Sequence, residues 1–142
     1  MIVQITGILK NKNIDEIVIE ANGLGYLCHI SNNTFNCLPS VGENITIPTF
    51  LHIMENKHTL YGFSDIEERK LFKMLISVSG IGPKIGIQLL SNANADQFST
   101  MIINSDVKML SSLPGIGPKT AKRLIIELKD KFTLTHQHDI PA

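Results

Sequence analysis

The sequence contains no Trp, only two Cys, and no apolar run close to the roughly 20 residues that a membrane-spanning helix needs. Cys28 and Cys37 form no CxxC pair, which indicates neither a disulfide framework nor a cysteine zinc site and favours core thiols in a reducing cytoplasm. The start of the chain lacks a charged region followed by a long apolar segment, so no signal peptide is predicted. We therefore expect a soluble, cytoplasmic protein.

Net charge is also absent, but the charges are unevenly distributed. Residues 1–63 hold three Lys and five carboxylates, whereas residues 64–142 hold ten Lys or Arg and eight carboxylates. No overall field is available to attract nucleic acid, a membrane or an acidic ligand. The opposite signs of the two parts instead indicate two domains with different surfaces.

Residues 1–63 show an apolar period of two and are rich in Ile, Val, Thr and Tyr, with Gly, Asn and Pro between the runs. The candidate strands are residues 2–10, 16–21, 25–30, 44–52 and 57–63. Asn22-Gly23 is a typical hairpin turn, and a helical turn over residues 31–38 suits an OB-type barrel. We predict a five-stranded OB-type β-barrel domain over residues 1–63.

After residue 63 the apolar period becomes that of a helix. The candidate helix starts are Ser64, which has Glu67 at capping-box spacing, then Asn94 or Asp96, then Asp106, and finally Pro118, which begins a helix through residue 131. We predict an all-α domain over residues 64–132 and a disordered tail or linker start over residues 133–142. The expected fold class is therefore α+β in two domains.

One segment is repeated at an offset of 35 residues. Residues 75–90 align with residues 110–125, and both contain the five-residue run Gly-Ile-Gly-Pro-Lys. In each copy an apolar helix end precedes Gly-x-Gly, and Pro follows at the first position of a helix, where its missing N–H costs nothing. The repeat predicts two helix-hairpin-helix motifs in tandem.

Each copy has the composition of a phosphate-binding corner. The four glycines permit positive φ and close approach of a ligand to the backbone, Ile81 and Ile116 are expected to point inward, and unpaired amides at a helix N-terminus attract anions. Lys84 and Lys119 lie in the first helical turn, where carboxylates are otherwise favoured by about 0.3–1 kcal/mol. The predicted DNA-binding residues are Gly80, Ile81, Gly82, Lys84, Gly115, Ile116, Gly117, Lys119, Thr120, Lys122 and Arg123.

The charges around the repeats agree with this interpretation. Residues 70–94 and 108–125 contain no carboxylate. Lys119, Lys122 and Arg123 share one face of the last helix, although Lys122 and Arg123 alone would more often form a solvated surface. Because phosphates carry no sequence information, we expect structure-selective and salt-dependent binding, and the lack of Trp argues against stacking on single strands.

These motifs resemble the RuvA family, the Holliday-junction-binding subunits of the bacterial branch-migration complex, along essentially the whole chain. The likeness lies in Met1-Ile2 with Gly7, Gly23-Leu24-Gly25-Tyr26, Leu60-Tyr61-Gly62-Phe63 and both hairpins, the second preceded by Leu113-Pro114. It implies a non-catalytic homotetramer without a cofactor or metal, which binds four-way junction DNA through minor-groove backbones. It further implies the RuvB motor and the RuvC resolvase as partners in recombination and repair, with no membrane or small-molecule substrate.

The sequence departs from the family pattern at two places. The resemblance implies an acidic pin between the last two strands, at the crossover of the junction, and the matching turn is Glu55-Asn56-Lys57. Asn56 replaces the expected second acid, and Lys57 offsets the charge of Glu55. The turn is therefore either a weakened pin or a solvated hairpin tip without this role. Family members also carry a linker and a third helical domain that contacts RuvB. This sequence ends in the linker region, and its residues do not distinguish a naturally truncated protein from a trimmed sequence.

Two other functions fit parts of the sequence. A generic helix-hairpin-helix module that recruits a repair enzyme would bind linear duplex and four-way junctions equally. A base-excision glycosylase would use Lys119 as a nucleophile, but it also needs a catalytic Asp. The later aspartates, Asp130 and Asp139, lie in the same predicted helix and in the tail. His136 and His138 could chelate a metal, with a bystander role as the alternative.

Overall fold

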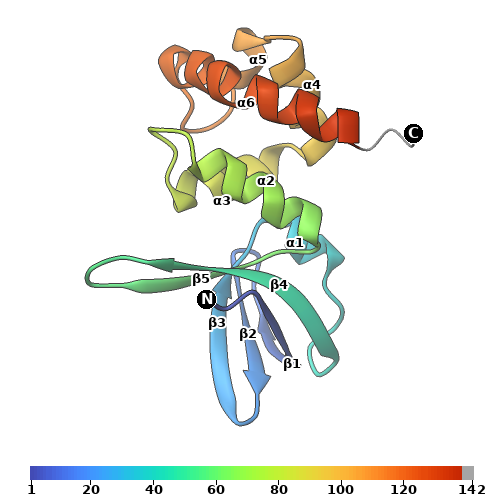
Figure 1. The fold of residues 1–142 in the computed structure, drawn as a ribbon. Coiled ribbons are helices and arrows are strands. Elements are labelled where there is room, and N and C mark those ends of the chain that lie inside the picture. Colours follow the sequence, from blue (N-terminus) through green and yellow to red (C-terminus); the bar gives the residue numbers. More distant parts are fainter. Residues whose placement is uncertain (139–142) are drawn as a thin grey trace. The chain divides into compact units, whose positions relative to one another are not determined.

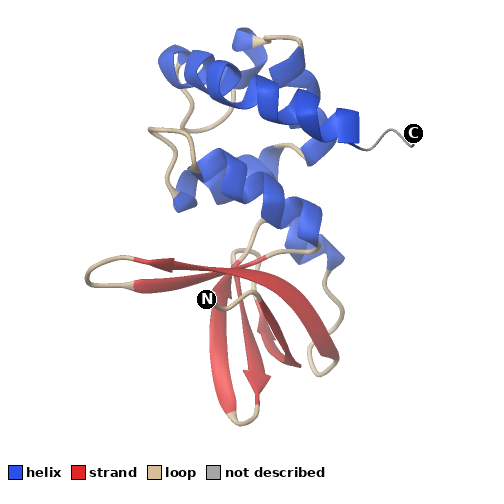
Figure 2. Ribbon diagram, in the orientation of Figure 1, coloured by secondary structure: helices blue, strands red, loops and turns tan. Residues whose placement is uncertain are grey.

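The structure, a computed structural model, describes residues 1–138, with side chains through Phe132, and shows two compact units (Figure 1). Met1–Lys70 form the first unit, and the second begins at Leu71. Figure 2 shows strands in the first unit and helices alone in the second. The expected fold class is confirmed: a closed five-stranded barrel precedes a helical unit.

The barrel has the strand order β1-β2-β3-β5-β4, and β4 pairs with β1 to close it. Its strands are β1 (Gln4–Lys12), β2 (Glu16–Ala21), β3 (Leu24–His29), β4 (Asn44–Ile53) and β5 (His58–Gly62). Asn22 and Gly23 have φ of 52° and 85°, the positive values that a tight hairpin turn requires. The barrel interior is filled by Ile5, Leu9, Ile17, Ile19, Cys28, Ile30, Ile47 and Leu60.

The short helix α1 (Asn32–Cys37) lies between β3 and β4, as the sequence predicts. Ser31 caps it by accepting a hydrogen bond from the Thr34 amide at 3.1 Å. Cys28 is a core thiol, and burial raises its pKa to about 12. The same expectation is wrong for Cys37, which lies in the last turn of α1 and is exposed.

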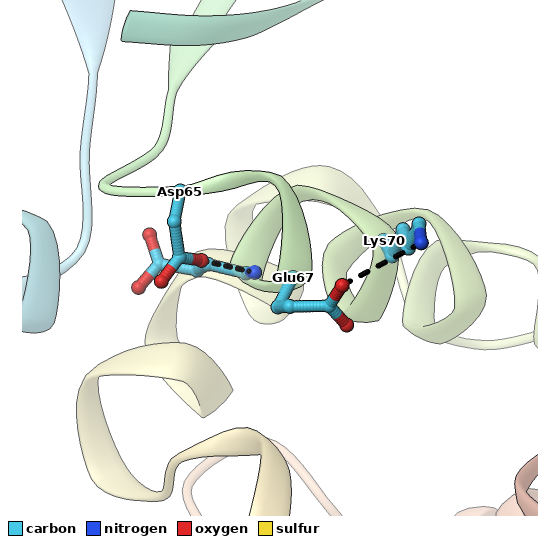
Figure 3. A network of polar contacts seen from close by, with 4 residues as sticks. Asp65, Glu67 and Lys70 are labelled. Atoms are coloured by element: carbon cyan, nitrogen blue, oxygen red, sulfur yellow. Dashed lines mark hydrogen bonds and ion pairs between the residues drawn. The ribbon is translucent and has the colours of Figure 1, made fainter. Parts of the chain in front are cut away.

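A buried carboxylate ties the first turn of α2 (Ile66–Ile76) to the barrel unit. Glu68 is 8% exposed and accepts hydrogen bonds from the hydroxyls of Thr34 and Ser31 and from the Ser64 amide. The capping residue of α2 is Asp65, whose Oδ1 accepts from the Glu68 amide at 2.8 Å, so the prediction of Ser64 as the cap is wrong by one residue. On the solvent side of this turn Glu67 pairs with Lys70 (Figure 3). The first compact unit, Met1–Lys70, includes this turn of α2.

The second unit contains the rest of α2 together with α3 (Pro83–Asn92), α4 (Ala95–Ile103), α5 (Val107–Ser111) and α6 (Pro118–His138). Asn94, one of the two candidates, caps α4 in a capping box with Gln97, and Asp106 caps α5 as predicted. Helix α6 packs against α4 and α5. No described helix is long and apolar enough to cross a membrane.

Helix α6 continues beyond residue 131, where the sequence predicted its end. Residues 133–138 of the expected tail are helical, whereas residues 139–142 lie outside the described part of the chain. Residues 133–138 contain no Gly or Pro, so nothing in this described segment stops a helix that is already formed.

We expect the substitution Glu68→Gln to change how stability depends on pH. Burial raises the pKa of Glu68 above its usual value of 4.5, although the hydrogen bonds from Thr34, Ser64 and Ser31 oppose this rise. A raised folded-state pKa means that the residue's contribution is complete below the unfolded value and is lost as pH rises through the folded value. Gln stays neutral, so the variant should gain in free energy of unfolding relative to wild type as pH increases through that window.

Urea denaturation at a series of pH values measures this difference. Glu67→Gln is the matched control, because Glu67 is an exposed carboxylate in the same turn. If the difference in free energy of unfolding between Glu68→Gln and wild type did not change with pH, or changed equally for Glu67→Gln, the raised pKa of Glu68 would be contradicted.

Candidate nucleic-acid interface

Two hairpins join helices in the second unit: residues 77–82 connect α2 to α3, and residues 112–117 connect α5 to α6. Their hydrogen bonds repeat at the offset of 35 seen in the sequence. The bond from Ser77 Oγ to Met74 O corresponds to that from Ser112 Oγ to Met109 O. The bond from Ile81 N to Val78 O corresponds to that from Ile116 N to Leu113 O. The bond from Gly86 N to Gly82 O corresponds to that from Ala121 N to Gly117 O. The sequence repeat is therefore a repeat of backbone structure.

The first glycine of each hairpin has the conformation that requires glycine. Gly80 has φ of 95° and Gly115 has φ of 79°, both in the left-handed region that favours a residue without Cβ. The second glycine differs, since Gly82 has φ of −87°, an ordinary extended value, and Gly117 is not among the residues with positive φ. Of the four glycines that permit positive φ, the first of each copy adopts it and the second does not.

The second glycines also meet no steric demand within the protein. A Cβ built on Gly82 or on Gly117 would find no atom within 4 Å. Neither backbone conformation nor internal packing explains why both copies have glycine at this exposed position. What remains is the space outside, where a bare Cα lets a ligand approach the backbone.

The amides that follow are placed at the start of each helix. Gly86 donates the first intrahelical hydrogen bond of α3 to Gly82, so the amides of Lys84 and Ile85 precede the helix's own bonds. Ala121 does the same for α6, which leaves Lys119 and Thr120 in the equivalent position. Each helix therefore presents amides and the positive end of its dipole beside an exposed glycine.

The two isoleucines between the glycines anchor the corners. Ile81 is 4% exposed and Ile116 is 5% exposed, which confirms that both point inward. They fill the core while the flanking glycines stay at the surface. These two predicted site residues therefore stabilise the corners by packing in the core, and their side chains do not form part of the exposed surface.

The hairpins also pack against each other in a reciprocal way. A Cβ on Gly80 would lie 3.8 Å from Oγ1 of Thr120, and a Cβ on Gly115 would lie 3.4 Å from Cγ2 of Ile85. Thr120 and Ile85 are equivalent positions of the repeat, so each first glycine faces the same position of the other copy. Arg123 adds a hydrogen bond from Nη1 to Ser79 O at 3.4 Å. The two corners thus lie side by side with an approximate twofold relation.

Cations surround the paired corners. Lys84, Lys119, Lys122 and Arg123 are all exposed, and within the described part of the chain none of them forms an ion pair with a carboxylate. The first turns of α3 and α6 contain no acidic residue. Lys119, Lys122 and Arg123 lie on the solvent side of α6, opposite the buried Ala121, Leu124 and Leu128. The site therefore combines amide donors with unneutralised positive charge.

Two predicted pin residues, Glu55 and Asn56, lie in the other unit at the turn between β4 and β5, and both are exposed. The Met54 amide donates to Lys57 O at 2.8 Å across this turn. The structure therefore places the pin residues at the tip of a hairpin of the first unit.

The described residues contain no group of three or more His, Cys, Asp or Glu that could hold a metal ion. The side chains of His136 and His138 lie outside the described part of α6, as does all of Asp139. Asp130 is exposed on α6, three turns beyond Lys119.

Comparison with known proteins agrees with this architecture. A family model described as RuvA N terminal domain matches residues 1–62, and one described as SAM-like helix-hairpin-helix tandem matches residues 72–130. A protein of Neisseria meningitidis serogroup C, named Holliday junction branch migration complex subunit RuvA, is 49% identical over 131 residues. The match covers 92% of this chain and 68% of the relative.

The chain belongs to the RuvA family. RuvA proteins of a Marinomonas species and of Geotalea daltonii, with the same name, are each 44% identical and match 99% and 92% of this chain. The chain spans about two thirds of the length of the RuvA relatives it matches, between 66% and 70%.

The two glycines of one hairpin should respond differently to Ala. Gly80→Ala and Gly115→Ala should each cost about 1–2 kcal/mol in free energy of unfolding, because an L-residue is strained at positive φ. Gly82→Ala and Gly117→Ala should lower the free energy of unfolding clearly less, because neither glycine has positive φ and a Cβ would meet no atom at either position. Chemical denaturation of the four variants tests this contrast, and equal costs within a hairpin would contradict the assignment.

Proposed function

We propose that this chain binds four-way DNA junctions through backbone phosphates and thereby serves as the non-catalytic, structure-selecting subunit of a branch-migration complex. The observation that carries the proposal is the pair of exposed glycines, Gly82 and Gly117, which nothing inside the protein requires. Bare Cα atoms beside free helix amides suit a ligand that presses its oxygens against the backbone. The names of the RuvA relatives supply the type of DNA.

The electrostatics of the corners favour a polyanion. A phosphate at the start of α3 or α6 would receive amide hydrogen bonds, the helix dipole, and the charge of Lys84 or Lys119. Lys122 and Arg123 continue the positive face along α6. Such contacts are to phosphate oxygens, so affinity should depend on salt and hardly on sequence.

The approximate twofold relation of the corners fits a duplex. The two strands of DNA are antiparallel and are related by a local twofold axis, so paired corners can hold one phosphate backbone each. The reciprocal proximity of Gly80 to Thr120 and of Gly115 to Ile85, with the hydrogen bond from Arg123 to Ser79, supports the corners acting as a pair. One helical unit would therefore hold one arm of a junction.

Four arms call for four such units, and we propose a homotetramer whose partners are a RuvB motor, which supplies ATP hydrolysis, and a RuvC resolvase. The turn with Glu55 and Asn56 would meet the crossover, where a single carboxylate is partly offset by Lys57. This assignment rests on the family membership and gives the chain a role in recombination and repair.

The enzyme alternative has little support in the described site. A glycosylase that uses Lys119 needs an Asp near it, whereas Asp130 lies three turns further along the same helix. Borohydride trapping on damaged duplex checks this directly, and a covalent adduct lost in Lys119→Gln would establish the enzyme.

Competition gel shifts test the preferred DNA structure. We expect a four-way junction to compete clearly better than linear duplex of the same arm sequence at physiological salt, because only a junction offers several arms to one oligomer. Equal affinity would support a generic module that recruits a repair enzyme and would remove the branch-migration assignment. Mass measurement with and without junction DNA reports the expected tetramer.

Replacing both exposed glycines with a β-branched residue should weaken binding to all DNA sequences alike. In the double variant Gly82→Val, Gly117→Val the branched side chains occupy the space that a phosphate backbone would use. The double variant should keep its helical circular dichroism. Loss confined to particular DNA sequences would contradict a backbone contact.

Each single substitution Lys84→Gln or Lys119→Gln should reduce the magnitude of the slope of log affinity against log salt by about 0.9 for each engaged subunit, hence by about 3.6 for a junction held by four subunits. Lys73→Gln is the control, since Lys73 is exposed on α2 outside the two corners. An equal change in all three variants would mean that the positive charge acts without a defined phosphate contact.

A further inference from the structure

The outer parts of β4 and β5 form a ribbon that no other strand accompanies. Strand β4 pairs with β1 only through Pro48, and β5 pairs with β3 only at Tyr61. Beyond these points the two strands pair with each other as far as Ile53 and His58. Figure 1 shows this hairpin projecting from the rest of the barrel.

The tip of the ribbon is apolar as well as polar. Ile53 is 59% exposed and Met54 is 56% exposed, directly before the turn of Glu55 and Asn56. The tip has little net negative charge, since Lys57 offsets Glu55 before β5 begins at His58. The tip therefore repels phosphates only weakly, whereas Ile53 and Met54 give it an exposed apolar surface.

We propose that Ile53 and Met54 act as an apolar wedge that contacts nucleobases exposed at an opened branch point. This inference rests on the proposed junction binding and adds the contact that the hairpin tip makes. Ile and Met are among the side chains that proteins insert between base steps, where the unstacked faces of bases offer an apolar partner. Met adapts its shape to such irregular surfaces.

Charge and area both favour bases as the partner. The near-neutral tip can approach a polyanion that a cluster of carboxylates would repel. Two side chains on a narrow ribbon are far too small for a stable contact between protein copies, which needs a buried area of about 1,000 Å² or more. A junction that is already held at its arms requires no additional affinity from the tip, only a local contact.

The test uses a four-way junction with 2-aminopurine at the branch point, whose fluorescence rises when the base unstacks. The full chain should raise the signal, and the double variant Ile53→Ser, Met54→Ser should lose at least half of that rise. The same variant should bind the junction within about twofold of wild type, because its phosphate contacts lie elsewhere. Ile14→Ser is the matched control, since Ile14 is 58% exposed on the loop between β1 and β2.

A third variant, Glu55→Gln, separates the apolar from the electrostatic mechanism. It should lose less of the fluorescence rise than the double variant, and thermal unfolding should show that all variants are folded. A full rise in the double variant, or a larger loss in Glu55→Gln, overturns the wedge while junction binding stands. If wild-type protein fails to prefer junctions in the gel shift, the proposed function falls and the wedge with it. A change of oligomeric state in the double variant would instead assign the tip to contacts between copies.

Discussion

The reciprocal packing of the two hairpins is the constraint on which the candidate nucleic-acid interface depends. The space where a side chain of Gly80 would lie is bounded by Thr120, and that of Gly115 is bounded by Ile85, so each corner borders the helix that follows the other. Arg123 reaches the carbonyl of Ser79 and joins the corners a third time. A distortion of one turn therefore changes the position of the other helix start. The amides that would meet the two strands of a duplex are a property of the pair, which explains why the motif occurs in tandem.

Much of this candidate site could be predicted because each copy of the repeat is a contiguous run of residues. The run Gly-Ile-Gly-Pro-Lys gave the corners, the helix starts and the inward direction of Ile81 and Ile116. The pattern did not reveal which glycine needs positive φ, since Gly80 and Gly82 are identical residues and only the backbone path distinguishes them. The contacts of Thr120 and Ile85 were also not predictable, because they depend on how two copies 35 residues apart pack.

The barrel was predicted at the level of its strands but not of its tertiary contacts. Strand β1 begins two residues later than expected, because the carbonyls of Ile2 and Val3 bond to Thr49 outside the regular ladder. Glu68 shows the same limit. It lies one helical turn before Leu71 and Phe72, on the apolar face of α2, so the sequence contained a sign of burial. Its partners Ser31 and Thr34 are more than 30 residues away, and only the fold brings them together.

The zero net charge of the chain is compatible with binding a polyanion, because screening makes the local arrangement decisive. At physiological ionic strength charges interact over about 8 Å. Along α6 the first carboxylate is Glu127, about 6 Å from Arg123 but about 12 Å from Lys119 by helix rise, so it partly offsets Arg123 and hardly reduces the attraction that Lys119 exerts. The distant carboxylates limit long-range attraction to any duplex instead. That balance suits the proposed selection of branched over linear DNA, since affinity would then depend on how many corners engage at once.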